Sequence, residues 1–176
     1  MSGVPEQSGG AIMTVVRYCT PEWLQSSAES YRSTPRFQQE LAKLATRVCF
    51  LIRAEPAWGI DKDILFCAFL RQGELEKLDF LNADDAKAQV EFIMGATPHE
   101  WKMILRKDRK FITDFMLGRI TLEQGSKVGV LAIAPHANTF VDILTQAELQ
   151  FPDEMSPEEL AAYRSHVATF RQESGV

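Results

Sequence analysis

Hydroxyl residues placed directly before proline mark where several helices are expected to begin. The chain has four such pairs: Thr20-Pro21, Thr34-Pro35, Thr97-Pro98 and Ser156-Pro157. A hydroxyl at the N-cap accepts a hydrogen bond from an otherwise unpaired amide, and proline at the next position loses no partner. Glu100 and Glu159 stand where a capping box needs its acidic residue. The pattern therefore predicts a helix after each pair.

Apolar residues then recur three, four and seven positions apart, which is typical of helices with one buried face. The predicted apolar faces are Phe37, Leu41, Leu44, Ala45 and Val48; Trp101, Ile104 and Leu105; Phe111, Ile112, Phe115 and Met116; Phe140, Ile143, Leu144 and Ala147; and Leu160, Tyr163, Val167 and Phe170.

The spacing of apolar residues changes from a helical to a strand-like pattern in the middle of the chain. Residues 47–54, 64–71, 76–81 and 88–94 are rich in β-branched and aromatic residues, and turn-forming residues, among them 82–85, separate them. Short connections favour antiparallel neighbours. A fifth strand, 119–123, follows two helices. We therefore predict an α+β fold, in which helices cover one face of a five-stranded, mostly antiparallel sheet.

Composition excludes several function classes. The 176 residues carry a formal charge of −5, which does not suit a protein that neutralises nucleic-acid phosphates. The N-terminal apolar run, 11–16, is too short for a membrane span or a signal peptide, so we expect at most transient membrane contact. Cys19, Cys49 and Cys67 have no CxxC spacing and predict neither a disulfide framework nor a zinc site. Buried free thiols fit a reducing compartment, and we expect a cytoplasmic protein.

Catalytic patterns are missing from the sequence. His99, His136 and His166 form no HExxH motif, and no nucleophile signature or dinucleotide-binding motif is present. The glycines of 125–129 fit no phosphate-binding spacing and predict a strand-to-helix turn. We therefore expect no enzyme activity, no cofactor and no metal. The basic cluster 106–110 leaves two interpretations open, a solvated corner or a dock for an anionic head group.

The stretch FITDFMLGRITLEQGSKVGVLAIAP, 111–135, resembles the sterol carrier protein type-2 family. Phe115, Met116 and Gly118 stand at its Phe-rich helix and glycine, and Ile120 and Leu122 stand in its strand. Residues 90–110 and 54–66 are compatible with other elements of the family, and the resemblance spans about 35–148. It implies an apolar tunnel between the sheet and the helices, which holds a sterol, fatty acyl chain or other lipid.

Four segments follow from this interpretation. They are a flexible tail (1–10), an N-terminal extension with a helix (11–34), a sterol carrier protein-like domain (35–150) and a C-terminal helical extension (151–176). The expected function is non-catalytic binding or carrying of an apolar ligand. An alternative is an accessory subunit that presents an apolar substrate to a partner enzyme, and a homodimer is also left open.

We expect the cavity between the strands 88–94 and 119–123 and the aromatic helices. The predicted ligand-binding residues are Phe92, Trp101, Ile104, Leu105, Phe111, Phe115, Met116, Ile120, Leu131, Phe140 and Leu144. Eleven phenylalanines, which carry no polar group, supply apolar surface for such a cavity or for the core.

Overall fold

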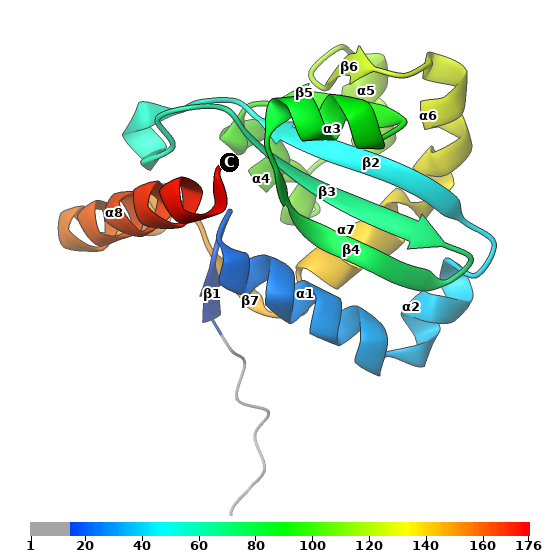
Figure 1. The fold of residues 1–176 in the computed structure, drawn as a ribbon, viewed down its shortest axis with the longest axis horizontal. Helices are drawn as coiled ribbons and strands as arrows, with labels where there is room; N and C mark the ends of the chain where they lie inside the picture. Colours follow the sequence, from blue (N-terminus) through cyan, green and yellow to red (C-terminus); the bar gives the residue numbers. More distant parts are fainter. Residues whose placement is uncertain (1–14) are drawn as a thin grey trace, which may run out of the picture.

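A five-stranded mixed sheet forms the centre of the computed structural model, which describes residues 15–176 (Figure 1). The predicted tail 1–10 and the start of the extension 11–34 lie outside the described residues. The strands run in the order β4-β3-β2-β5-β6, and every neighbouring pair is antiparallel except β2–β5. Their bounds are β2 Ala45–Ile52, β3 Ile64–Arg71, β4 Glu74–Leu81, β5 Phe92–Ala96 and β6 Thr121–Gln124. The predicted α+β class and mostly antiparallel sheet are confirmed.

Helices and short turns connect and cover these strands. The α-helices are α1 Pro21–Ser33, α2 Pro35–Glu40, α3 Ala83–Gln89, α4 Pro98–Leu105, α5 Phe111–Met116, α6 Lys127–Ile133, α7 Ala137–Leu144 and α8 Pro157–Ser174. The 3-10 turns are η1 Pro56–Trp58, η2 Ala134–His136 and η3 Pro152–Glu154, and a separate parallel pair joins β1 Val15–Arg17 to β7 Glu148–Gln150. A helix begins after each of the four hydroxyl–proline pairs, as predicted.

The cap contacts differ among these helices. The Ser156 hydroxyl accepts from the Glu159 amide at 3.2 Å and the Glu159 carboxylate accepts from the Ser156 amide, which completes the predicted capping box. The Thr97 hydroxyl accepts from the Glu100 amide at 3.2 Å, but the Glu100 carboxylate pairs with Arg109 instead. The box predicted at Thr97 is therefore incomplete.

Two predicted elements have different bounds. The helix after Pro35 ends at Glu40, and Val48, which is predicted on its apolar face, belongs to β2.

Residues 82–85, predicted as a turn, instead form the start of helix α3. The Asn82 side chain accepts from the Asp85 amide at 2.8 Å and caps α3. This helix is the crossover that a parallel pair requires, and it brings β5 beside β2 rather than beside β4.

The two faces of the sheet meet different helices. Along β2, Thr46, Val48 and Phe50 face the main helical layer, whereas Cys49 and Leu51 pack on the opposite face with Ala86 of α3. Figure 1 shows α3 in front of the sheet and α4 and α7 behind it. The predicted helical layer is thus present, and α3 adds a smaller cover on the other face.

A disulfide joins Cys49 and Cys67, so the prediction that these two residues are free thiols is wrong. The two residues lie directly opposite each other in the β2–β3 register, with their Cα atoms 4.0 Å apart. Their spacing along the chain gave no sign of this pairing because it depends on the register of the hairpin. Cys19 is a buried free thiol. The cytoplasmic location stays a prediction. The disulfide removes the argument from three free thiols that supported it.

The terminal segments contact the central layer closely. The Trp23 indole of α1 donates to the carbonyl oxygen of Leu144 at 2.8 Å, and the Tyr163 hydroxyl of α8 donates to the carbonyl oxygen of Tyr18 at 2.6 Å. The segment boundaries at 34 and 150 stay predictions. Within residues 15–176, no helix combines the length and the apolar character needed to cross a membrane.

Candidate ligand-binding pocket

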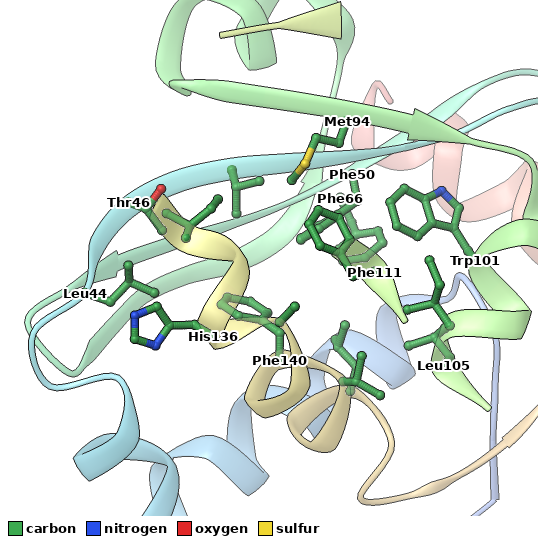
Figure 2. Close-up of a pocket in the computed structure, with 16 residues that line it drawn as sticks. Leu44, Thr46, Phe50, Phe66, Met94, Trp101, Leu105, Phe111, His136 and Phe140 are labelled. Carbon is green, nitrogen blue, oxygen red and sulfur yellow. The ribbon is translucent and has the colours of Figure 1, made fainter. Parts of the chain in front are cut away.

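An apolar cavity of about 70 Å³ lies between the sheet and the helical layer (Figure 2). Strands β2, β3 and β5 form one wall, and α4, α5, α6, η2 and α7 form the other. The lining residues are Leu44, Thr46, Val48, Phe50, Phe66, Met94, Trp101, Ile104, Leu105, Phe111, Ile133, His136, Ala137, Phe140, Val141 and Leu144. Fourteen of these sixteen side chains are hydrophobic, so the cavity suits an apolar occupant.

Phe50 is the centre of an aromatic cluster in this wall. Its ring stacks on Phe66 with centroids 4.9 Å apart, meets Trp101 edge-on at 5.7 Å and lies 6.2 Å from Phe140. The indole N–H of Trp101 donates to the carbonyl oxygen of Leu51 at 3.0 Å. The polar atom of Trp101 is therefore satisfied by the sheet, which leaves its ring as apolar wall.

The structure brings together six of the predicted ligand-binding residues: Trp101, Ile104, Leu105, Phe111, Phe140 and Leu144. Phe92, Phe115 and Ile120 are buried outside the cavity lining. Met116 at the end of α5 is 67% exposed, and Leu131 on the outer side of α6 is 44% exposed. Helical spacing predicted an apolar face with Phe115 and Met116, but it does not reveal which neighbour the short helix α5 packs against.

The location of the cavity also differs from the prediction. Met94 of β5 lines it, as expected for the strand predicted at 88–94, but β6 does not contribute. The sheet wall comes mainly from β2 and β3, through residues outside the predicted ligand-binding set. Alternation along Thr46, Val48 and Phe50 was the available signal, because side chains two apart in a strand share a face.

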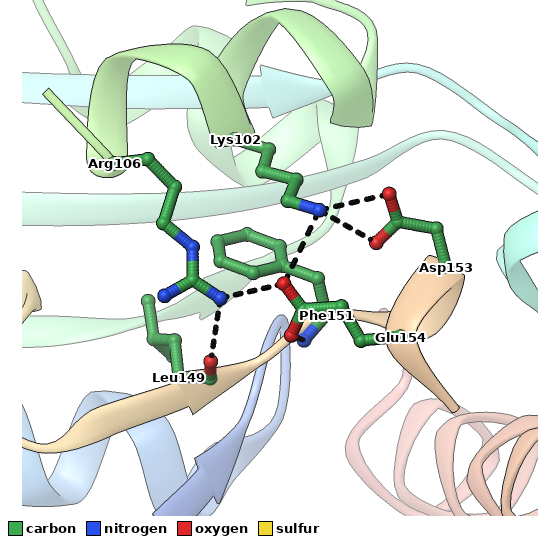
Figure 3. Close-up of polar contacts among 6 residues, drawn as sticks. All are labelled: Lys102, Arg106, Leu149, Phe151, Asp153 and Glu154. Atoms are coloured by element: carbon green, nitrogen blue, oxygen red, sulfur yellow. Dashed lines mark hydrogen bonds and ion pairs between the residues drawn. The ribbon is translucent and has the colours of Figure 1, made fainter. Parts of the chain in front are cut away.

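A polar cluster fixes α4 against the C-terminal segment (Figure 3). Lys102 contacts Asp153 at 2.8 Å and Glu154 at 3.2 Å, and Arg106 contacts Glu154 at 2.6 Å. Both cations lie over the Phe151 ring. Burial alone would lower the pKa of Lys102, but its bonds to Asp153 and Glu154 raise it overall. These ion pairs attach one side of α4 to the segment around Asp153 and Glu154, and the opposite side of α4 lines the cavity.

The basic cluster 106–110 is largely compensated by carboxylates. Besides Arg106, Lys107 contacts Asp142 at 2.7 Å, and Arg109 pairs with Glu100 and lies 3.2 Å from the buried Asp114. These contacts favour the interpretation of the cluster as a structural corner. They join α4 to α7 and α5, the helices that cover the cavity.

The three histidines have different surroundings. His136 is half-buried and lines the cavity, His99 is exposed in the first turn of α4, and His166 lies 3.1 Å from Glu22. In the part of the chain that the structure describes, no group of three or more His, Cys, Asp or Glu side chains is arranged to hold a metal ion.

Solved structures of sterol carrier proteins share this α+β fold. A solution structure from Thermus thermophilus, described as possibly that of a sterol carrier protein, matches with a TM-score of 0.64 and 17% identity. The match covers 73% of this chain and 88% of that one. The crystal structure of sterol carrier protein 2 matches with a TM-score of 0.57 and 17% identity, over 71% of this chain and 92% of that one.

The resemblance seen in the sequence is thus confirmed at the level of the fold. No protein-family model matches the chain, and no curated protein matches it.

Proposed function

We propose that this protein binds or carries an apolar ligand, such as a fatty acyl chain, a sterol or another lipid, without transforming it. The observation that carries the proposal is the cavity lining, in which Thr46 and His136 are the only polar side chains among the described residues. The shared fold with sterol carrier protein 2 supports the same assignment. Of the three histidines, only His136 lines the cavity, whereas the imidazole of His166 pairs with Glu22 outside the lining.

The energetics of burial suit this role. Each buried methylene contributes about 0.8 kcal/mol, so ten contribute roughly 8 kcal/mol before ordering costs. Cavities that hold ligands are typically about 300–1,000 Å³, and this one measures about 70 Å³. A long chain is therefore expected to need the helical layer to move away from the sheet, and Phe140 and Ala137 of α7 are among the lining side chains that this movement would displace.

The alternative of an accessory subunit uses the same cavity and adds a partner enzyme. That partner, a homodimer, transient membrane contact and a cytoplasmic location remain predictions. Ligand binding by the purified chain alone is the common requirement, so it is the property to test first.

Titration with the uncharged fluorescent probe N-phenyl-1-naphthylamine, followed by displacement with fatty acids, sterols and phospholipids, tests the proposal. Ala137→Phe places a ring inside the cavity and is expected to weaken probe binding at least tenfold. Ala132→Phe adds the same ring to the exposed side of α6 and is the matched control. Circular dichroism of both variants shows whether the fold is kept.

The proposal fails if no lipid class displaces the probe from the natural protein. It also fails if the two variants bind the probe equally well, because the cavity would then not be the binding site.

A further inference from the structure

The hydroxyl of Thr46 is a buried polar group without a hydrogen-bond partner among the described residues, in the otherwise apolar wall of the cavity. Thr46 is 3% exposed and lines the cavity from the start of β2. Among residues 15–176, no group makes a hydrogen bond with its Oγ1 atom. A buried hydroxyl without a partner is destabilising, and such groups are rare in folded proteins. Valine has nearly the same shape and would fill this position without that cost.

The polar residues gather at one end of the cavity. Figure 2 shows Leu44, Thr46 and His136 at that end and Trp101 and Leu105 at the other. His136 is half-buried on η2, so its ring lies between the cavity and solvent. A chain that extends from Thr46 toward Trp101 would contact hydrophobic side chains for the rest of its length.

The charge of the lining restricts the head group. None of the described residues that line the cavity is Lys, Arg, Asp or Glu. Burial of an ionised carboxylate without a cation is strongly unfavourable, whereas an uncharged hydroxyl needs only a hydrogen-bond partner. Thr46 can both donate to and accept from a hydroxyl.

Building on the proposed function, we infer that Thr46 recognises the head group of the ligand through a hydrogen bond. The ligand class is a long-chain amphiphile with an uncharged hydroxyl, bound with its hydroxyl at Thr46 beside His136 and its chain toward Trp101. Thr46 is then a specificity-determining residue, and the ligand supplies the hydrogen bond that its hydroxyl lacks.

Competition against N-phenyl-1-naphthylamine with decan-1-ol, 1-chlorodecane and sodium decanoate tests this inference on the full chain. Decan-1-ol and 1-chlorodecane have the same chain, but only the alcohol can donate a hydrogen bond. Thr46→Val is expected to weaken decan-1-ol binding about fivefold and to leave 1-chlorodecane binding unchanged. Thr46→Ser keeps a hydroxyl and should retain the selectivity of the natural protein. Thr139→Val is the control, because the Thr139 hydroxyl already donates to Glu40 at 2.7 Å and lies outside the lining.

Equal losses for the alcohol and the chloride in Thr46→Val would overturn the inference, because they indicate a packing effect. Tighter binding of decanoate than of decan-1-ol by the natural protein would overturn it as well, since the site would then accept an anionic head. The decanoate comparison does not depend on whether Thr46→Val folds. If none of the three ligands displaces the probe although a sterol or a phospholipid does, this inference fails and the proposed function stands. If no lipid class displaces the probe, the proposed function fails.

Discussion

The indole N–H of Trp23 donates to the carbonyl oxygen of Leu144 at 2.8 Å, across 121 positions of the chain. Leu144 is the last residue of α7 and lines the cavity, so α1 fixes the end of the helix that covers it. The N-terminal helix thereby takes part in building the candidate site, although it contributes no lining residue.

Trp23→Phe removes this hydrogen bond and leaves the Leu144 carbonyl without its indole partner. We expect the free energy of unfolding to fall by about 1–3 kcal/mol, because a buried acceptor loses its donor. Urea denaturation measures the change. Trp58→Phe is the comparison, since Trp58 is half-buried and packs on Phe151 without such a bond across the core. Equal stability losses in the two variants would show that ring size, not the hydrogen bond, is what matters.

Thiol titration tests the Cys49–Cys67 disulfide. Burial raises the pKa of the Cys19 thiol to about 12, so the folded oxidised protein is expected to react with no thiol reagent at neutral pH. Unfolding without a reductant should expose one thiol per chain, and unfolding after reduction should expose three. Three thiols without a reductant would show that the two cysteines are unpaired.

Reduction of that disulfide should also lower stability. The bond spans 18 positions. Closing a loop of this size lowers the conformational entropy of the unfolded chain, which stabilises the folded state by about 3 kcal/mol. We expect Cys49→Ala/Cys67→Ala to be less stable than the oxidised natural protein and to gain nothing from an oxidant. Denaturation curves with and without reductant give the comparison.

The contact of Glu154 with Lys102 and Arg106 predicts a loss of stability in acid. Burial by itself raises the pKa of Glu154, but hydrogen bonds from the Phe151 amide and Lys102 and the charge of Arg106 lower it overall. A pKa that is lower in the folded state contributes stability above the unfolded value, near 4.3, and loses it as the pH falls through the folded value.

Glu154→Gln should therefore lower the melting temperature at pH 7 and have progressively less effect below about pH 4. Glu158→Gln changes a neighbouring exposed carboxylate of α8 and serves as the control. A difference between Glu154→Gln and the natural protein that stays constant from pH 7 to pH 3 would contradict the prediction.

Gly129 allows α6 to approach the sheet at Phe92. A Cβ atom added at Gly129 would lie 2.5 Å from the Cζ atom of Phe92. Alanine is the better helix former by about 1 kcal/mol, but overpacking typically costs about 1–3 kcal/mol. We expect Gly129→Ala to be destabilised, and Phe92→Leu to relieve part of that loss in the double variant. Additive effects in a double-mutant cycle would mean that the two residues do not interact.

Local patterns predicted much of the fold from the sequence. The bounds of β3 match the predicted strand 64–71 because a run of apolar residues is bounded by clear turn residues. The start of α8 follows from Ser156 and Glu159, whose capping contacts involve only neighbours. Asn82 was ambiguous, since the same residue type favours turns and helix N-caps, and α3 was missed for this reason.

The candidate site was predictable only in part. Trp101, Phe111 and Phe140 lie on faces whose helical spacing is visible in the sequence. The wall formed by Phe50 and Phe66 depends on which side of the sheet the main helical layer covers, and that is a matter of tertiary packing that spacing along the chain does not show. The orphaned hydroxyl of Thr46 is a tertiary property, because a threonine in a strand ordinarily signals only β propensity.

The small volume of the cavity links ligand affinity to the fraction of molecules in which the helical layer is displaced from the sheet. If only a fraction of the molecules has the helical layer displaced, the observed affinity is the intrinsic affinity scaled by that fraction. Phe140 packs on Phe50 with ring centroids 6.2 Å apart and so favours the closed form. Truncation of Phe140 to alanine would raise the open fraction, so this one change makes the folded chain less stable while it makes a long ligand bind more tightly.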